Sequence, residues 1–182
     1  MYLKHFYDSC LPLKTGVFKD SGAWAVVCDG MGGVKGGQIA SEICVNEVSK
    51  HIEKGYRKNM SMKSVKNLLV SAITAANIKV FETAEENKEY SGMGTTVVAV
   101  VILNGFAAVA HVGDSRAYFI SDEIKQITRD HSVVQYLIDI GRITEEQAKT
   151  HPDRNVITRA VGVSSEVDID VEIIPINQGQ KI

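Results

Sequence analysis

The sequence predicts an α+β protein in which antiparallel strands pack against amphipathic helices. Two segments, 40–55 and 61–83, carry apolar residues at the spacing of one helix face. Apolar and β-branched runs follow at 95–103 and 106–112, and the turn-forming pair Asn104-Gly105 separates them. Two long helices followed by a hairpin indicate an antiparallel sheet with a helix pair on its apolar face.

Composition indicates one domain of ordinary size. The chain has 182 residues, 45% of them hydrophobic, which is enough for a sizeable core. Its net charge of -2 is spread without long blocks of one sign, so neither a nucleic-acid partner nor an anionic membrane surface is expected. No run approaches the roughly 18 apolar residues of a membrane span, and the first residues lack the layout of a secretion signal. We therefore expect a cytoplasmic protein.

The cysteines point the same way. Cys10, Cys28 and Cys44 are an odd set without a C-x-x-C pair. This argues against a disulfide framework and against a structural zinc site. We expect all of them to be reduced residues of the core.

The stretch 23–33 is an apolar run that ends abruptly at an acid and a glycine-rich turn. Its apolar part predicts a buried strand that presents Asp29 at its tip, with a helix directly after the turn. Glycines let the backbone turn tightly and approach a ligand closely. We expect that role for five of them: Gly30, Gly32, Gly33, Gly36 and Gly37.

The residues alone leave open three interpretations of this turn. A dinucleotide-binding loop would need its third glycine at the position of Lys35, and Asp29 would repel a pyrophosphate. A purely structural turn is compatible with the Asp-Gly pair. A site for a hard cation would use the Asp29 carboxylate and the Gly30 carbonyl as oxygen ligands for Mg²⁺ or Mn²⁺.

The remaining elements follow in order. Before residue 18, Pro12 and Gly16 suggest a strand that ends in a loop. Gly55 is placed to end the first helix and Ser61 to cap the second. Segments 117–120 and 124–127 predict a further hairpin around residues 121–123. A short helix is expected over 132–140, ending at Gly141.

The last part of the chain predicts one more helix and a strand. Thr144 and Gln147 have the spacing of a capping box, and Pro152 ends the helix that they begin. Apolar residues then alternate with Asp168, Asp170 and Glu172, which is typical of a half-buried edge strand.

Ordered motifs across the chain resemble the bacterial branch of the protein phosphatase 2C family of metal-dependent serine/threonine phosphatases. The motifs are Asp-Gly-Met-Gly-Gly at 29–33, Gly-Met-Gly-Thr-Thr at 92–96 and His-Val-Gly-Asp-Ser-Arg at 111–116. Segments 129–132, 141–144 and 151–162 resemble the flap region of that family. The resemblance implies one phosphatase 2C-like domain over 1–182, with a flap at 129–162. It also implies a four-layer α-β-β-α sandwich, two antiparallel sheets flanked by helix pairs.

The resemblance also implies a site and a reaction. Asp29 would bridge two divalent metals, Mn²⁺ or Mg²⁺, and would be the catalytic residue. Gly30 would add its carbonyl oxygen, and Asp114 would lie near a third, weaker metal position. A water that bridges the metals would attack the phosphorus of phosphoserine or phosphothreonine without a phosphoenzyme intermediate. The implied substrates are phosphoproteins made by bacterial serine/threonine kinases.

The sequence departs from the family at both ends. The family's phosphate-binding arginine and Glu-Asp pair have no counterpart before residue 20, and two further metal-binding aspartates have none before Ile182. We therefore expect a sandwich incomplete at both ends, a segment that is inactive alone, and self-association through exposed sheet edges. A non-catalytic phosphatase-like binding or regulatory domain is the alternative, and a nucleotide-binding protein ranks last.

Other polar residues receive no chemical role from the sequence. Asp114 alone would suggest a turn acid paired with Arg116. His131 is expected to cap or pack locally, and Arg154 and Arg159 are expected to be flap residues without a catalytic role.

Overall fold

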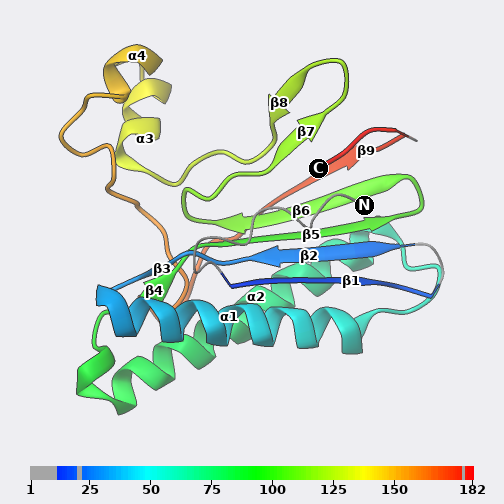
Figure 1. The fold of residues 1–182 in the computed structure, drawn as a ribbon, viewed down its shortest axis with the longest axis horizontal. Coiled ribbons are helices and arrows are strands. Elements are labelled where there is room, and N and C mark those ends of the chain that lie inside the picture. Colours follow the sequence, from blue (N-terminus) through cyan, green and yellow to red (C-terminus); the bar gives the residue numbers. More distant parts are fainter. Residues whose placement is uncertain (1–11, 20–21, 178) are drawn as a thin grey trace.

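The computed structural model describes residues 12–19, 22–177 and 179–182, and its centre is a five-stranded antiparallel sheet (Figure 1). The strands lie in the order β1-β2-β5-β6-β9, and neighbours run antiparallel throughout. Their bounds are β1 Leu13–Val17, β2 Ala23–Val27, β5 Val97–Leu103, β6 Phe106–Val112 and β9 Asp170–Pro175. The predicted α+β class with antiparallel sheets is confirmed.

Two long helices cover one face of this sheet. They are α1 (Gly33–Gly55) and α2 (Met62–Glu86), which pack against each other and contact β2 and β6, respectively. The Ser61 hydroxyl accepts a hydrogen bond from the Ser64 amide and caps α2, as its position in the sequence predicts. Alternate residues of β5 enter the core beneath the helices, among them Val97, Ala99 and Val101.

The glycine-rich turn is shorter than the sequence suggests. Since α1 begins at Gly33, Gly36 and Gly37 belong to the helix and do not form the turn. The chain reverses instead through Gly32 and Gly33, whose φ angles are 102° and 81°. Gly30 and Met31 form β3 (Gly30–Met31), which pairs with β4 (Gly94–Thr95).

The predicted hairpin in the middle of the sheet is confirmed. Asn104 and Gly105 have φ angles of 53° and 75°, as a two-residue type I′ turn requires, and Leu103 pairs with Phe106. At the edge of the sheet, β1 begins after Pro12 and contains Gly16, so Gly16 does not end the strand. A side chain at Gly16 would meet the Trp24 indole at 2.5 Å, which explains the glycine.

The described cysteines are buried and free, as expected, whereas Cys10 lies outside the described residues. Cys28 and Cys44 lie next to each other. A hydrogen bond with Cys44 and burial raise the pKa of the Cys28 thiol, which keeps it protonated and unreactive. None of the described helices is long and apolar enough to span a membrane.

The opposite face of the sheet carries a smaller apolar cluster built on Val98, Val109 and Ala117. Beside it lies the predicted second hairpin, β7 (Tyr118–Ile120) and β8 (Ile124–Gln126). Of the four layers that the resemblance implies, the described residues thus form one helix pair, one large sheet and this two-stranded sheet. They form no second helix pair over the small sheet.

Most of segment 129–162 forms a lobe beside the sheet (Figure 1), and the segment returns to the core at Val161, which pairs with Thr95. Both predicted helices are present, α3 (Val133–Asp139) with Ser132 as its cap and α4 (Glu145–Ala148) with the Thr144–Gln147 capping box. The 3₁₀ turn η1 (Lys88–Tyr90) links α2 to β4.

Hydrogen exchange is expected to be faster in this lobe than in β5. None of the residues of α3 is fully buried, whereas most of β5 is. Local opening costs least where few apolar side chains are buried. Exchange measured by mass spectrometry on peptides from 133–148 and 97–103 tests this, and slower exchange in the lobe would contradict it.

Candidate metal centre

Asp29 lies just beyond the end of β2, and its backbone is held from both sides. Its amide donates to Thr96 Oγ1 at 3.1 Å. Its carbonyl oxygen accepts from the Thr96 amide at 2.8 Å and from Thr95 Oγ1 at 2.9 Å. Asp29 itself is exposed, although Cys28 before it is fully buried. The chain therefore presents one carboxylate on a fixed backbone at the tip of a strand.

Gly30, the next residue, is packed against the first turn of α1. A Cβ atom at Gly30 would lie 1.9 Å from the Gly37 carbonyl oxygen. The two glycines thus let the tip of β2 and the start of α1 touch through their backbones. This close packing explains why both positions are glycine, independently of any metal binding.

Asp114 lies in a loop that rests on the residue holding Asp29. Gly113 has a φ angle of 103°, and a Cβ there would lie 2.6 Å from Thr96 Cγ2. Ser115 Oγ and Thr96 Oγ1 are 2.6 Å apart and share a hydrogen bond. Thr96 therefore connects the Asp29 tip and the Asp114 loop.

The residues alone suggested that Arg116 pairs with Asp114, but it does not. Its guanidinium donates to both carboxylate oxygens of Asp130, with distances of 2.7 to 3.0 Å. The described residues supply no hydrogen-bond donor to the Asp114 carboxylate, which leaves that carboxylate available as a ligand.

The two site carboxylates influence each other electrostatically. Partial burial of the Asp29 carboxyl group and the negative charge of Asp114 raise the pKa of Asp29. A divalent cation held by both groups would cancel this repulsion, and carboxylate and carbonyl oxygens are the ligands that Mg²⁺ and Mn²⁺ prefer. The donor set of Asp29, Gly30 and Asp114 therefore fits a hard divalent metal.

A dinucleotide site does not fit this architecture. The strand that leads into the glycine turn, β2, is antiparallel to both of its neighbours. The dinucleotide fold needs a parallel βαβ unit at this place.

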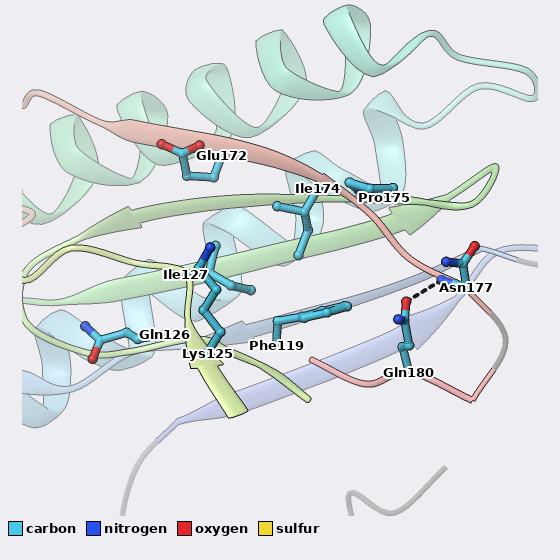
Figure 2. A pocket seen from close by; sticks show the side chains of 9 residues that line it. All are labelled: Phe119, Lys125, Gln126, Ile127, Glu172, Ile174, Pro175, Asn177 and Gln180. Carbon is cyan, nitrogen blue, oxygen red and sulfur yellow. Dashed lines mark hydrogen bonds between the residues drawn. The ribbon is translucent and has the colours of Figure 1, made fainter. Parts of the chain in front are cut away.

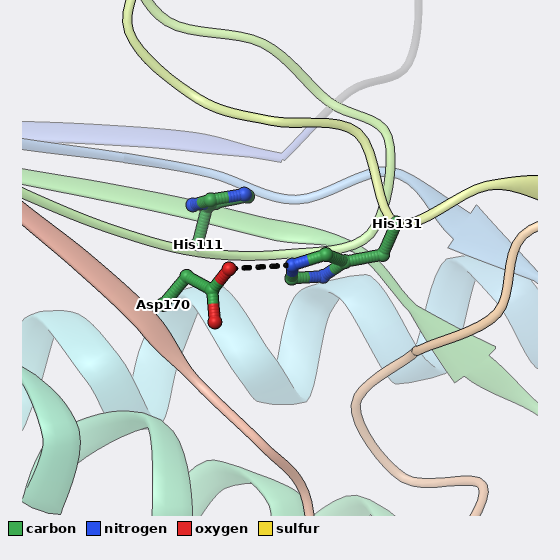
Figure 3. A group of neighbouring side chains, drawn as sticks. All are labelled: His111, His131 and Asp170. Carbon is green, nitrogen blue, oxygen red and sulfur yellow. Dashed lines mark hydrogen bonds and ion pairs between the residues drawn. The ribbon is translucent and has the colours of Figure 1, made fainter. Parts of the chain in front are cut away.

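A second group of polar side chains lies near the ends of β6 and β9 (Figure 3). His111, His131 and Asp170 place ligand atoms within 4.8 Å of one another, which is close enough to hold a metal ion. The two imidazoles stack with centroids 4.7 Å apart. His131 Nε2 lies 3.2 Å from Asp170 Oδ2, and Arg159 donates to Asp170 Oδ1 at 3.0 Å.

Hydrogen bonds fix the proton positions in this group. Because the Gly113 amide donates to His131 Nδ1 at 3.1 Å, neutral His131 carries its proton on Nε2 and donates it to Asp170. His111 Nε2 donates to the Arg129 carbonyl at 2.8 Å, and His111 Nδ1 is buried without a partner. A metal at His131 Nε2 would have to displace that proton, so the arrangement favours a hydrogen-bonded network over a metal site.

The pKa values agree with this assignment. Burial, with the charges of His111 and Arg159, lowers the pKa of His131 despite its bond to Asp170. Burial would raise the pKa of Asp170, but its bond to His131 and the charge of Arg159 lower it overall. His131 is therefore neutral and Asp170 ionised at neutral pH.

This network was not predicted from the sequence. His131 was expected to cap or pack locally, but its side chain bonds to Gly113 and Asp170, which are distant in the sequence. Arg159 is half-buried against Asp170, and neither His111 nor Asp170 stood out. The missing information is the strand register, in which His111 and Asp170 are direct partners on β6 and β9. A histidine near the end of an otherwise apolar strand is the only local signal.

Acid is expected to destabilise the fold through His131. Since its pKa in the folded state lies below the ordinary value of 6.5, its contribution to stability is present above that pH and is lost as the pH falls. The unfolding midpoint should therefore decrease between about pH 7.5 and about pH 5.5. His131→Gln, which does not titrate, should show a weaker decrease, and a parallel pH dependence in both proteins would contradict the assignment.

A pocket away from these residues is shown in Figure 2. It has a volume of about 460 Å³ and lies between the β7–β8 hairpin and β9, lined by Phe119, Ile127 and Ile174 among others. None of the predicted site residues lines it. It does not mark the metal centre.

Comparison with known proteins gives the family. Residues 8–164 match the family described as protein phosphatase 2C. The chain belongs to this family. The serine/threonine phosphatase stp of Listeria innocua is 36% identical over 163 residues, 88% of this chain and 64% of that protein. The protein phosphatase PhpP of Streptococcus pneumoniae is 32% identical over 160 residues, 85% of this chain and 62% of that protein.

The solved structures agree with this assignment. The crystal structure of serine/threonine phosphatase Stp1 from Staphylococcus aureus superimposes with a TM-score of 0.85 at 36% identity, over 96% of this chain and 68% of that one. The family that the motifs predicted is thus confirmed. The chain spans slightly under two thirds of the length of the curated protein phosphatase 2C relatives that it matches.

Proposed function

We propose that this chain contributes the Asp29 metal centre of a metal-dependent protein serine/threonine phosphatase. The main support is that Thr96 bonds to both Asp29 and the Asp114 loop, which places the two carboxylates near each other. The family is metal-dependent, and relatives of this chain are named serine/threonine phosphatases. Mn²⁺ and Mg²⁺ match the oxygen donors.

Each site residue has a distinct part in this proposal. Asp29 would hold two metals through its carboxylate and would be the catalytic residue, Gly30 would offer its carbonyl oxygen, and Asp114 would serve a weaker third position. When bound, a pair of divalent metals activates water for attack on the phosphorus and neutralises the charge on the phosphate. Thr95 and Thr96 keep the Asp29 backbone from moving. Fixed ligands hold such a pair at a constant spacing.

The proposal extends to the surroundings of the site. Residues 1–182 would be one cytoplasmic phosphatase 2C-like domain with 129–162 as its flap. Its substrates would be phosphoproteins of serine/threonine kinases. Val17 and Ile124 are 67% and 71% exposed on the edge strand β1 and the β7–β8 hairpin. This supports self-association through exposed edges.

Residues 1–182 alone are expected to have negligible activity. Two metals with about six oxygen ligands each need several carboxylates, and the described residues bring only Asp29 and Asp114 to this place. Phosphate release from a phosphothreonine peptide with Mn²⁺ should therefore be absent for 1–182. It should appear in a polypeptide extended at both ends by the family's acidic segments.

Asp29→Asn in the longer polypeptide controls for contaminating phosphatase. Asp29-dependent turnover by 1–182 alone would disprove its inactivity. A longer polypeptide that binds phosphoprotein without hydrolysing it would instead support the non-catalytic binding or regulatory domain.

A further inference from the structure

His131 lies where three parts of the molecule meet. It follows the β7–β8 hairpin at the entrance of segment 129–162, and its side chain is only 6% exposed. It contacts the Asp114 loop at Gly113, the end of segment 129–162 at Thr158 and Arg159, and β9 at Asp170.

Two hydrogen bonds join His131 to the Asp114 loop. The His131 amide donates to the Gly113 carbonyl oxygen at 3.0 Å, and the Gly113 amide donates to His131 Nδ1 at 3.1 Å. Both polar backbone groups of Gly113 are thereby fixed by one residue. Asp114 is the next residue in the chain, so its direction depends on this contact.

The other contacts fix the imidazole itself. Nε2–H donates to Asp170 Oδ2 (Figure 3). Arg159 donates to the second oxygen of that carboxylate. His111 stacks on the ring from the β6 side. The Thr158 amide donates to the His131 carbonyl at 2.8 Å, so the two ends of segment 129–162 meet at this residue.

We propose that His131 is a positioning residue whose Nδ1 contact with Gly113 holds the Asp114 carboxylate in place, while its Nε2–H bond to Asp170 fixes the tautomer and orientation of the ring. This rests on the proposed function only in the role given to Asp114 as a metal ligand. The positioning itself is a property of the metal-free chain.

Two substitutions separate the two bonds of the imidazole. His131→Asn keeps an acceptor close to the position of Nδ1, whereas His131→Gln keeps a donor close to that of Nε2. His131→Ala removes both. His51→Gln is the matched control, because His51 lies on α1 and bonds only its own helix at the Glu47 carbonyl.

The first measurement is amide exchange of Gly113 by NMR in the metal-free protein. We expect exchange to become about tenfold faster or more in the Gln and Ala variants, and to remain close to the original in the Asn and His51 variants. Equal exchange in the original protein and in His131→Gln would overturn the proposal. An equal loss of Gly113 protection in all three His131 variants would also overturn the proposal. It would show that the packing of the imidazole ring, and not its Nδ1 bond, protects Gly113.

The second measurement is Mn²⁺ titration by calorimetry. His131→Gln should lower the Mn²⁺ affinity as Asp114→Asn does. His131→Asn should keep the Mn²⁺ affinity of the original protein. If Asp114→Asn changes nothing while Gly113 exchange responds as expected, the proposed metal role fails and the positioning role stands.

One measurement needs no variant. The ¹⁵N shifts of the His131 ring should show an unprotonated Nδ1 and a protonated Nε2. A proton on Nδ1 would overturn the proposal even if every variant failed to fold.

Discussion

Asp29→Asn is expected to abolish divalent metal binding and to leave the fold intact. The substitution removes the charge that both metals would share, at an exposed position where little apolar surface is buried. Loss of a supporting residue outside the ligand shell already costs about 10- to 100-fold in metal affinity, so loss of the shared ligand should cost more than about 100-fold. Calorimetric titration with Mn²⁺ measures the change.

Asp122→Asn is the matched control, because Asp122 is an exposed acid in the β7–β8 turn, away from the Asp29 tip.

Asp29→Asn should also raise the thermal stability of the metal-free protein. Because burial and Asp114 raise the pKa of Asp29, its ionised form destabilises the metal-free fold above the ordinary pKa of 3.8. The metal-free Asp29→Asn protein should therefore melt at a higher temperature near neutral pH, and this gain should vanish below that pKa. Unchanged Mn²⁺ affinity would show that Asp29 is not the ligand.

Gly30→Ala is expected to destabilise the protein more than any other glycine-to-alanine change at the turn. The new Cβ would lie 1.9 Å from the Gly37 carbonyl oxygen and 2.3 Å from its carbonyl carbon, both of which are backbone atoms of α1. Either the helix start or the Asp29 tip must then shift. Overpacking of this kind costs about 3 kcal/mol of unfolding free energy.

Gly36→Ala is its matched control in the same segment. A Cβ there would lie 3.2 Å from Met93 Cβ, and alanine within a helix is favoured over glycine by about 1 kcal/mol. Urea unfolding should therefore separate the two variants clearly. Equal midpoints would mean that the close contact of Gly30 and Gly37 does not constrain the site.

Local signals in the sequence predicted most of the fold. Asn104-Gly105 gave the central hairpin and its register, and Ser61 and Thr144 marked helix starts through their own side-chain bonds. These features depend on neighbours a few residues apart. Gly36 and Gly37 were assigned to the turn because glycines fit a turn as well as a tight backbone contact.

The unpredicted part of the site depends on pairing between distant segments. His111 and Asp170 meet only because β9 pairs with β6 in one register, and a shift by one residue would turn Asp170 to the other face. Likewise, Thr96 connects Asp29 with the Asp114 loop through side-chain bonds that no spacing in the sequence reveals.

The most direct test of the central claim is anomalous X-ray diffraction from crystals of this chain soaked in Mn²⁺. We predict a manganese peak bound by the Asp29 carboxylate and the Gly30 carbonyl oxygen, with Asp114 facing it. A peak among His111, His131 and Asp170 with none at Asp29 would contradict it.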